Sequence, residues 1–152
     1  MNNNIEFLCI NRESYLYDEA INLVYESLFK DFGYSKETIL AEKENSGIHI
    51  VAVYNSKVIG HARLFLENNF GQISQVAVAE EYRGMNIGSQ VINRIVDIAR
   101  KFKAEYVELN SREYAISFYE KLGFVKNGDI KKSIKTGMSL LNMRKYIETL
   151  SK

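Results

Sequence analysis

The sequence predicts an α/β fold, a mixed sheet flanked by helices, in one domain spanning residues 1–152. One observation is a change of period. Apolar residues recur at helical spacing between Tyr17 and Phe32, then alternate with a period of two from Ile48 onward. A second is the alternation of helix-like and strand-like segments after the third strand of that run. A length of 152 residues fits one domain that buries a core without disulfides or metals.

The N-terminal part predicts one strand and two helices. Residues 5–10 form a short β-like run. Gly33 suits the C-terminus of the helix that follows, and Ser35 can cap a second, short helix through about Glu44. The apolar face of the first helix comprises Ile21, Val24, Tyr25, Leu28, Phe29 and Phe32.

A three-stranded meander is expected next, over residues 48–54, 57–66 and 70–78. Asn55-Ser56 makes the first hairpin turn, and residues 67–69 make the second. The first of these strands is rich in β-branched residues, as a pleated and half-buried surface favours.

The remaining elements complete the order β-α-α-β-β-β-α-β-α-β-β. A helix begins near Ser89, a strand covers residues 106–110, and a helix covers about 112–122, ended by Gly123. Phe124 is then placed to contact Tyr119 in the last turn of that helix. Two closing strands are predicted, from Val125 onward and over 139–146. The apolar face of the helix near Ser89 comprises Val91, Ile92, Ile95, Val96, Ala99 and Phe102.

Composition narrows the partners. A formal net charge of +1 provides no global field for nucleic acid or anionic membranes, and no apolar run has membrane-spanning length. The single Cys9 is expected to be a buried strand thiol, and His49 and His61 lack metal-ligand spacing, so no metal site is predicted. The N-terminus has no secretory pattern, which makes the cytoplasm the default location.

The loop Arg83-Gly84-Met85-Asn86-Ile87-Gly88 carries a specific chemistry because it joins a strand to a helix. Such a turn directs backbone N–H groups into one concavity at the positive end of the helix dipole, which receives phosphates. Glycine permits close approach, Asn86 tolerates left-handed dihedral angles, and Arg83 can bond a phosphate oxygen. Neither a Walker A loop nor a G-x-G-x-x-G loop fits. The alternative is a packing turn with no ligand.

A second group of residues lies at the end of a strand and on the following helix. It comprises Asn110, Ser111, Arg112, Ala115, Phe118, Tyr119, Leu122, Gly123 and Phe124. Phe118 is expected to belong to the core. The hydroxyl of Tyr119 needs a partner if it is buried, and its ordinary pKa of about 10 suits a proton donor.

Together the two groups resemble the GNAT superfamily of acetyltransferases. The family loop Q/R-x-x-G-x-G/A is matched at Arg83 to Gly88, with Asn86 where the middle glycine is expected. The pattern N-x-x-x-x-A-x-x-F-Y-x-K-x-G-F is matched from Asn110 to Phe124. Both matches agree in order and spacing, and the element order agrees over nearly the whole chain. The resemblance implies the acyl-CoA N-acyltransferase fold.

The resemblance also implies the roles of individual residues, with acetyl-CoA as co-substrate and an amine as acceptor. Val76, Ala77 and Val78 would pair with the pantetheine arm, and the Val78 amide would polarise the thioester carbonyl. Tyr119 would protonate the departing thiolate, and Asn110 would be a further catalytic residue. Contacts to CoA would come from Arg83, Gly84, Met85, Asn86, Ile87, Gly88 and Ser89 at the pyrophosphate, and from Asn110, Phe118 and Lys121, the last toward the 3′-phosphate.

Several points stay open. Glu67, Glu108 and His61 are candidates for the base that deprotonates the amine, and water is an alternative. The acceptor is not identified, and both a monomer and a homodimer stay open as alternatives. Other hypotheses are a non-catalytic acyl-CoA binding or sensing domain, a module for another nucleotide, and a partner-binding domain without a ligand.

Overall fold

The structure is a computed structural model that describes residues 4–37, 47–134 and 137–148. It divides into two compact units, each described by itself. Unit 1 comprises Met1–Phe65 and Gln75–Ile95, and unit 2 comprises Leu66–Ser74 and Val96–Lys152. The prediction for the second helix, from Ser35 to Glu44, lies largely outside the described residues.

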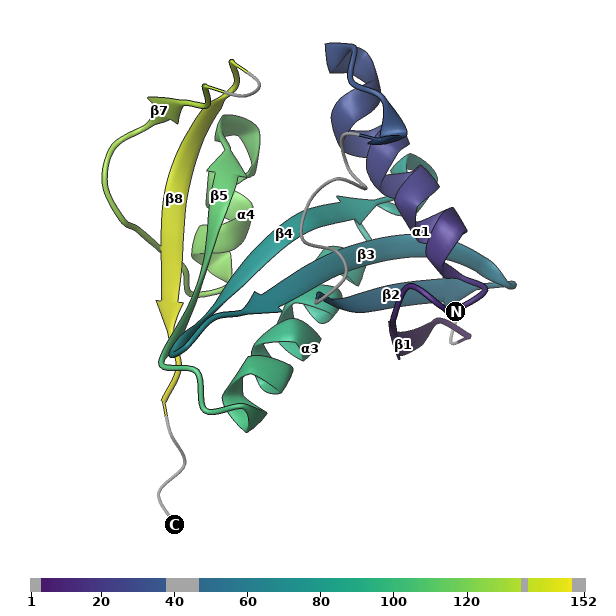
Figure 1. The fold of residues 1–152 in the computed structure, drawn as a ribbon, viewed down its shortest axis with the longest axis horizontal. Helices are drawn as coiled ribbons and strands as arrows, with labels where there is room; N and C mark the ends of the chain where they lie inside the picture. Colours follow the sequence, from purple (N-terminus) through teal and green to yellow (C-terminus); the bar gives the residue numbers. More distant parts are fainter. Residues whose placement is uncertain (1–3, 38–46, 135–136, 149–152) are drawn as a thin grey trace. The chain divides into compact units, whose positions relative to one another are not determined.

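The described strands join one mixed sheet in the order β1-β2-β3-β4-β5-β8-β6, with β7 paired to β8 (Figure 1). β4 and β5 are parallel, whereas β1–β2, β2–β3, β5–β8, β6–β8 and β7–β8 are antiparallel. This confirms the predicted mixed α/β fold. The strands are β1 (Glu6–Ile10), β2 (Ile48–Tyr54), β3 (Lys57–Leu66), β4 (Phe70–Val78), β5 (Tyr106–Arg112), β6 (Val125–Lys126), β7 (Lys131–Lys132) and β8 (Ser139–Tyr146).

In unit 1, helix α1 (Tyr17–Val24) covers one face of β2 and β3. Leu16 and Ala20 pack there against Val51, Val53 and Val58. The first turns of α3 (Ile87–Lys101) cover the opposite face, where Ile87 and Val91 approach Gly60. Because helices cover both faces, β2 is buried on both, rather than on alternate residues as in a half-exposed strand.

The predicted helix over residues 17–32 is a single helical run that changes type. After α1 it continues as a π-helix, η1 (Tyr25–Phe29), and a 3₁₀ turn, η2 (Lys30–Phe32), before Gly33 ends it at φ 77°. The change of helix type rotates the C-terminal turn away from the α-helical stripe. Phe32 is therefore 51% exposed, and the prediction that it lies on the apolar face with the other five residues is wrong.

In unit 2, β5 is buried along alternate residues and packs beside α4 (Ile116–Lys121), which follows a 3₁₀ turn, η5 (Glu113–Ala115). The core includes Val107, Leu109, Tyr119, Phe124, Leu141 and Met143. Gly123 has φ 96°, and the Phe124 N–H donates to the Tyr119 carbonyl at 3.1 Å, so the predicted end of this helix is confirmed.

Four further predictions need correction. α3 begins at Ile87, not near Ser89, so the last two residues of the loop already belong to the helix. Phe102 lies beyond the end of α3 and is 64% exposed. The first closing strand is only the two-residue β6, and a separate β7 follows. Cys9 is exposed, because β1 is the edge strand of the sheet and pairs only with β2.

In the part of the chain that the structure describes, no helix has the length and hydropathy needed to cross a membrane.

Candidate active site

The loop before α3 has the backbone that a phosphate cradle requires. Gly84 has φ 85° and Asn86 has φ 61°, with Arg83 at φ −70° before them. Gly84 tolerates this conformation because it has no Cβ, and asparagine is among the residues that reach it most easily. The expectation that Asn86 takes the place of a glycine is confirmed for its dihedral angle.

The first helical hydrogen bond runs from the Gln90 N–H to the Asn86 carbonyl at 3.1 Å. The N–H groups of Ile87, Gly88 and Ser89 precede it and point out of the N-terminus of the helix. Two left-handed residues directly before a helix N-terminus turn successive backbone N–H groups into one concavity. The chemistry of this donor set therefore fits a phosphate group.

Two anchors fix the loop to unit 1. The Arg83 Nε–H donates to the Val78 carbonyl at 3.1 Å, which ties the loop to the end of β4. Ile87 is 1% exposed, so its side chain belongs to the core and anchors the start of α3. Arg83, Gly84, Met85 and Asn86 are exposed, and Gly88 and Ser89 are half-buried.

A left-handed residue precedes the segment assigned to the pantetheine arm. Gln75, inside β4, has φ 55°. Val76 and Val78 are half-buried and Ala77 is buried, and the Ala79 N–H then donates to the Ile59 carbonyl at 2.9 Å. Sequence reasoning missed Gln75, because glutamine gives no signal for positive φ. It also missed Gly60, whose role depends on which helix packs against it.

Tyr119 lies in α4 of unit 2 and is 7% exposed. Its ring contacts Phe118 and Phe124 edge to face, with centroids 4.9 and 5.7 Å away. Burial, and then Tyr114, raise the pKa of Tyr119 above its ordinary value, so the hydroxyl stays protonated. Phe118 is half-buried and Lys121 is exposed. The Lys145 ammonium donates to the Leu122 carbonyl at 2.6 Å and stabilises the C-terminus of α4, a contact that the sequence did not indicate.

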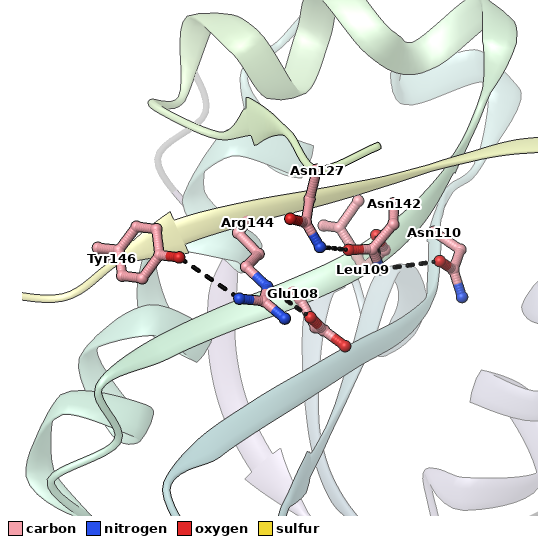
Figure 2. Close-up of polar contacts among 7 residues, drawn as sticks. All are labelled: Glu108, Leu109, Asn110, Asn127, Asn142, Arg144 and Tyr146. Carbon is pink, nitrogen blue, oxygen red and sulfur yellow. Dashed lines mark hydrogen bonds and ion pairs between the residues drawn. The ribbon is translucent and has the colours of Figure 1, made fainter. Parts of the chain in front are cut away.

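Two asparagine side chains, Asn142 and behind it Asn127, fix the orientation of the Asn110 side chain (Figure 2). The Asn127 Nδ2–H donates to Asn142 Oδ1 at 2.7 Å, and Asn142 Nδ2 donates to Asn110 Oδ1 at 3.0 Å and to the Leu109 carbonyl at 3.3 Å. Oδ1 of Asn110 is therefore occupied, whereas its Nδ2 has no hydrogen-bond partner among the residues that the structure describes. The three asparagines line a pocket of about 260 Å³ together with Leu140 and the polar residues Asp129, Lys131, Lys132 and Ser133.

The three candidates for the base have different surroundings. Glu108 accepts a hydrogen bond from Arg144 Nε at 2.9 Å (Figure 2), and Glu67 is exposed at the turn before β4. His61 is fully buried, and both of its ring nitrogens are in hydrogen bonds. Of the three, Glu67 has the exposure that contact with an acceptor requires.

The predicted residues thus gather in two places. Val76, Ala77, Val78 and the loop from Arg83 to Ser89 lie together in unit 1, whereas Asn110, Phe118, Tyr119 and Lys121 lie together in unit 2.

Comparison of the sequence with known proteins finds acetyltransferases. The sequence model of the acetyltransferase (GNAT) family matches residues 11–124. An uncharacterized N-acetyltransferase, ycf52, from Pyropia yezoensis is 29% identical over 131 residues, covering 81% of this chain and 72% of its own. The glucosamine 6-phosphate N-acetyltransferase of Trypanosoma brucei brucei is 35% identical over 75 residues, 45% of this chain and 51% of that protein, about half its length.

Solved structures agree in fold. A GNAT family acetyltransferase from Elizabethkingia anophelis, crystallised with acetyl-CoA bound, superimposes with a TM-score of 0.77 at 19% identity, covering 96% of this chain and all of that one. Because the family match spans three quarters of the sequence and includes both the loop and the Tyr119 helix, the chain belongs to the GNAT family of acetyltransferases.

Proposed function

We propose that this protein transfers the acetyl group of acetyl-CoA to an amine by direct attack within a ternary complex, with Tyr119 as the general acid. One observation carries the proposal: the left-handed Gly84 and Asn86 stand directly before the N-terminus of α3. This backbone suits a pyrophosphate better than it suits a plain packing turn, which needs no two positive φ angles.

On the donor side, the N–H groups from Gly84 to Ser89 hold the pyrophosphate, and the exposed Arg83 adds a cation beside it. Val76, Ala77 and Val78 bind the pantetheine arm through their backbone. Phe118 and Lys121 line the remainder of the coenzyme, with Lys121 toward the 3′-phosphate. Bound acetyl-CoA supplies the activated acetyl thioester.

At the reacting carbonyl, the Val78 N–H donates to the oxygen on which negative charge develops. A fixed backbone donor does this without reorganisation, and removal of such a donor costs about 10²–10³ in kcat in a well-studied hydrolase. Asn110, in unit 2, is assigned a further role in the reaction, and Asn142 fixes its side chain by donating to its Oδ1. Neither group changes protonation during the reaction.

Tyr119 delivers the proton that the leaving sulfur requires. Its raised pKa keeps the hydroxyl protonated throughout the neutral range, which is the state an acid must start from. The ring is held by Phe118 and Phe124, so the hydroxyl is positioned by packing. The amine must lose a proton before it attacks, because an amine with a pKa near 10.4 is neutral in only about one molecule in 10³ at pH 7.

A screen of CoA release over chemically distinct amines tests the activity. The panel contains amino acids, polyamines, aminoglycosides, peptides and glucosamine 6-phosphate, and calorimetry measures acetyl-CoA binding separately. We expect binding, and turnover with at least one class of amine. Binding without turnover on every amine would favour the alternative, a non-catalytic acyl-CoA sensor, and absence of binding would refute both.

A further inference from the structure

We propose that His61 is a positioning residue for acetyl transfer: with His49 behind it, it holds the left-handed backbone of Gln75, and through it the segment Val76–Val78. This inference rests on the proposed function of that segment. It concerns residues of unit 1 alone, since all of them lie within Met1–Phe65 and Gln75–Ile95.

The observation is a buried chain of hydrogen bonds from β2 through β3 to β4. His49 Nδ1 lies 2.9 Å from His61 Nε2, and His61 Nδ1 lies 2.7 Å from the Gln75 carbonyl oxygen. Both imidazoles are 0% exposed, and the edge of the Tyr17 ring packs on His49 with centroids 5.5 Å apart. The chain is therefore shielded from water along its length.

The chemistry of the atoms fixes where the protons lie. A carbonyl oxygen only accepts, so His61 Nδ1 carries the proton that it donates to Gln75. Burial, and then His49, lower the pKa of His61 to about 3, so His61 is neutral and its Nε2 accepts. His49 Nδ1 must then donate. His61 is therefore the Nδ1–H tautomer, His49 carries a proton on Nδ1, and every donor in the chain points from β2 toward β4.

The hydrogen bond from His61 ends on the backbone of Gln75, the left-handed residue of β4. Gln75 has φ 55°, a conformation that costs energy for any residue with a Cβ. Its side chain does not hold the turn, because neither amide atom has a hydrogen-bond partner among the described residues. The backbone carbonyl of Gln75 accepts the hydrogen bond from His61 Nδ1, so this bond acts directly on the left-handed residue.

The conformation of Gln75 sets the direction of the backbone groups that follow it. Val76, Ala77 and Val78 follow Gln75 immediately, so a change of φ at Gln75 redirects their N–H and carbonyl groups. Loss of the His61 donor leaves a buried carbonyl unsatisfied and the left-handed backbone unsupported. Strand β4 then relaxes toward an ordinary extended conformation. The Val78 N–H, which is assigned to the thioester carbonyl, no longer points toward that oxygen.

A matched pair of variants separates the donor from the rest of the side chain. In His61→Asn the amide nitrogen stands as many bonds from Cβ as Nδ1 does and can still donate to Gln75, whereas His61→Leu fills the space and donates nothing. We expect kcat for acetyl transfer to fall about 10-fold or more in His61→Leu and within about 3-fold in His61→Asn, because removal of one positioned donor costs roughly 10²–10³ at most. Equal losses in the two variants would overturn the proposal.

A second-site variant tests the link to Gln75. Gly adopts positive φ without strain, so Gln75→Gly keeps the left-handed backbone when the His61 donor is absent. The double variant His61→Leu/Gln75→Gly is expected to recover most of the lost kcat. A double variant as slow as His61→Leu would show that His61 does not act through Gln75.

Nuclear magnetic resonance gives a readout independent of activity and of acetyl-CoA. Long-range ¹H–¹⁵N spectra of the wild-type protein are expected to show His61 protonated at Nδ1 and not at Nε2 between pH 6 and 8, with a proton on His49 Nδ1. An Nε2–H tautomer of His61 would refute the proposal even if His61→Leu fails to fold. If the wild-type protein transfers no acetyl group, the proposed function fails, while amide shifts of residues 76–78 in His61→Leu and His61→Asn still report on positioning.

Discussion

Gly60 and Ile87 lie so close that a Cβ on Gly60 would be 2.9 Å from Ile87 Cγ2. The same Cβ would be 3.2 Å from the Cβ of Ala52, so it has contacts on two sides. Ile87 is the first residue of α3 and the anchor of the candidate phosphate loop. Strand β3 therefore sets how deeply the start of α3 sits against the sheet.

Gly60→Ala is expected to destabilise the protein by about 1–3 kcal/mol, as over-packing of a close-packed core does. It is also expected to weaken CoA binding, because the start of α3 moves outward. Urea unfolding and calorimetry measure the two effects. Ile87→Ala removes Cγ2. The double variant Gly60→Ala/Ile87→Ala should therefore lose less free energy of unfolding than the sum of the losses in the two single variants. Strict additivity would contradict the contact.

Asn86 provides a test of the loop backbone by itself. Asn86 has φ 61°. Asn86→Gly keeps this left-handed conformation, whereas Asn86→Val places a β-branched residue in a conformation that such residues strongly disfavour. The affinity for CoA should be retained within about 3-fold in the first variant and fall about 10-fold or more in the second, which corresponds to at least about 1.4 kcal/mol. Tighter CoA binding by Asn86→Val than by Asn86→Gly would refute the phosphate cradle.

Gly88→Leu is expected to abolish CoA binding, because a side chain there would fill the space through which the phosphate approaches the backbone.

Much of this arrangement follows from sequence patterns, and the exceptions have physical causes. The loop and the Tyr119 helix follow from local spacing, and glycine and asparagine signal positive φ by their chemistry. Gln75 and Gly60 gave no such signal, because tertiary contacts hold them. Cys9 was wrongly assigned to the core since strand composition does not tell an edge strand from a central one.

Tyr119→Phe removes one hydroxyl and keeps the ring that packs against Phe118 and Phe124. We expect kcat to fall by about 10²–10⁴, the usual contribution of a general acid, with little change in acetyl-CoA affinity. Steady-state kinetics and calorimetry make this comparison. Tyr114→Phe, which removes a nearby exposed hydroxyl, is the control and should retain activity. Unchanged kcat in Tyr119→Phe would exclude Tyr119 as the acid.

Asn142→Asp is expected to reverse the side-chain amide of Asn110. A carboxylate only accepts, so Asn110 would turn Nδ2 toward residue 142 and present its oxygen instead. Turnover should fall more than in Asn142→Ala, which removes the partner without forcing the reversal. Equal turnover in the two variants would mean that the orientation of Asn110 does not matter to the reaction.

The buried His61 makes stability depend on pH with a predictable sign. Its pKa is about 3 in the folded protein and near 6.5 when unfolded, so between these values the unfolded chain binds a proton that the folded chain does not. The contribution of His61 is thus fully present above about pH 6.5 and is lost as pH falls toward 3, by about 2 kcal/mol between pH 7 and pH 5. Urea unfolding at both values should show a loss in the wild type that exceeds the loss in His61→Asn by about this amount. Equal losses in the two proteins would mean that His61 is protonated in the folded state and does not accept a hydrogen bond from His49.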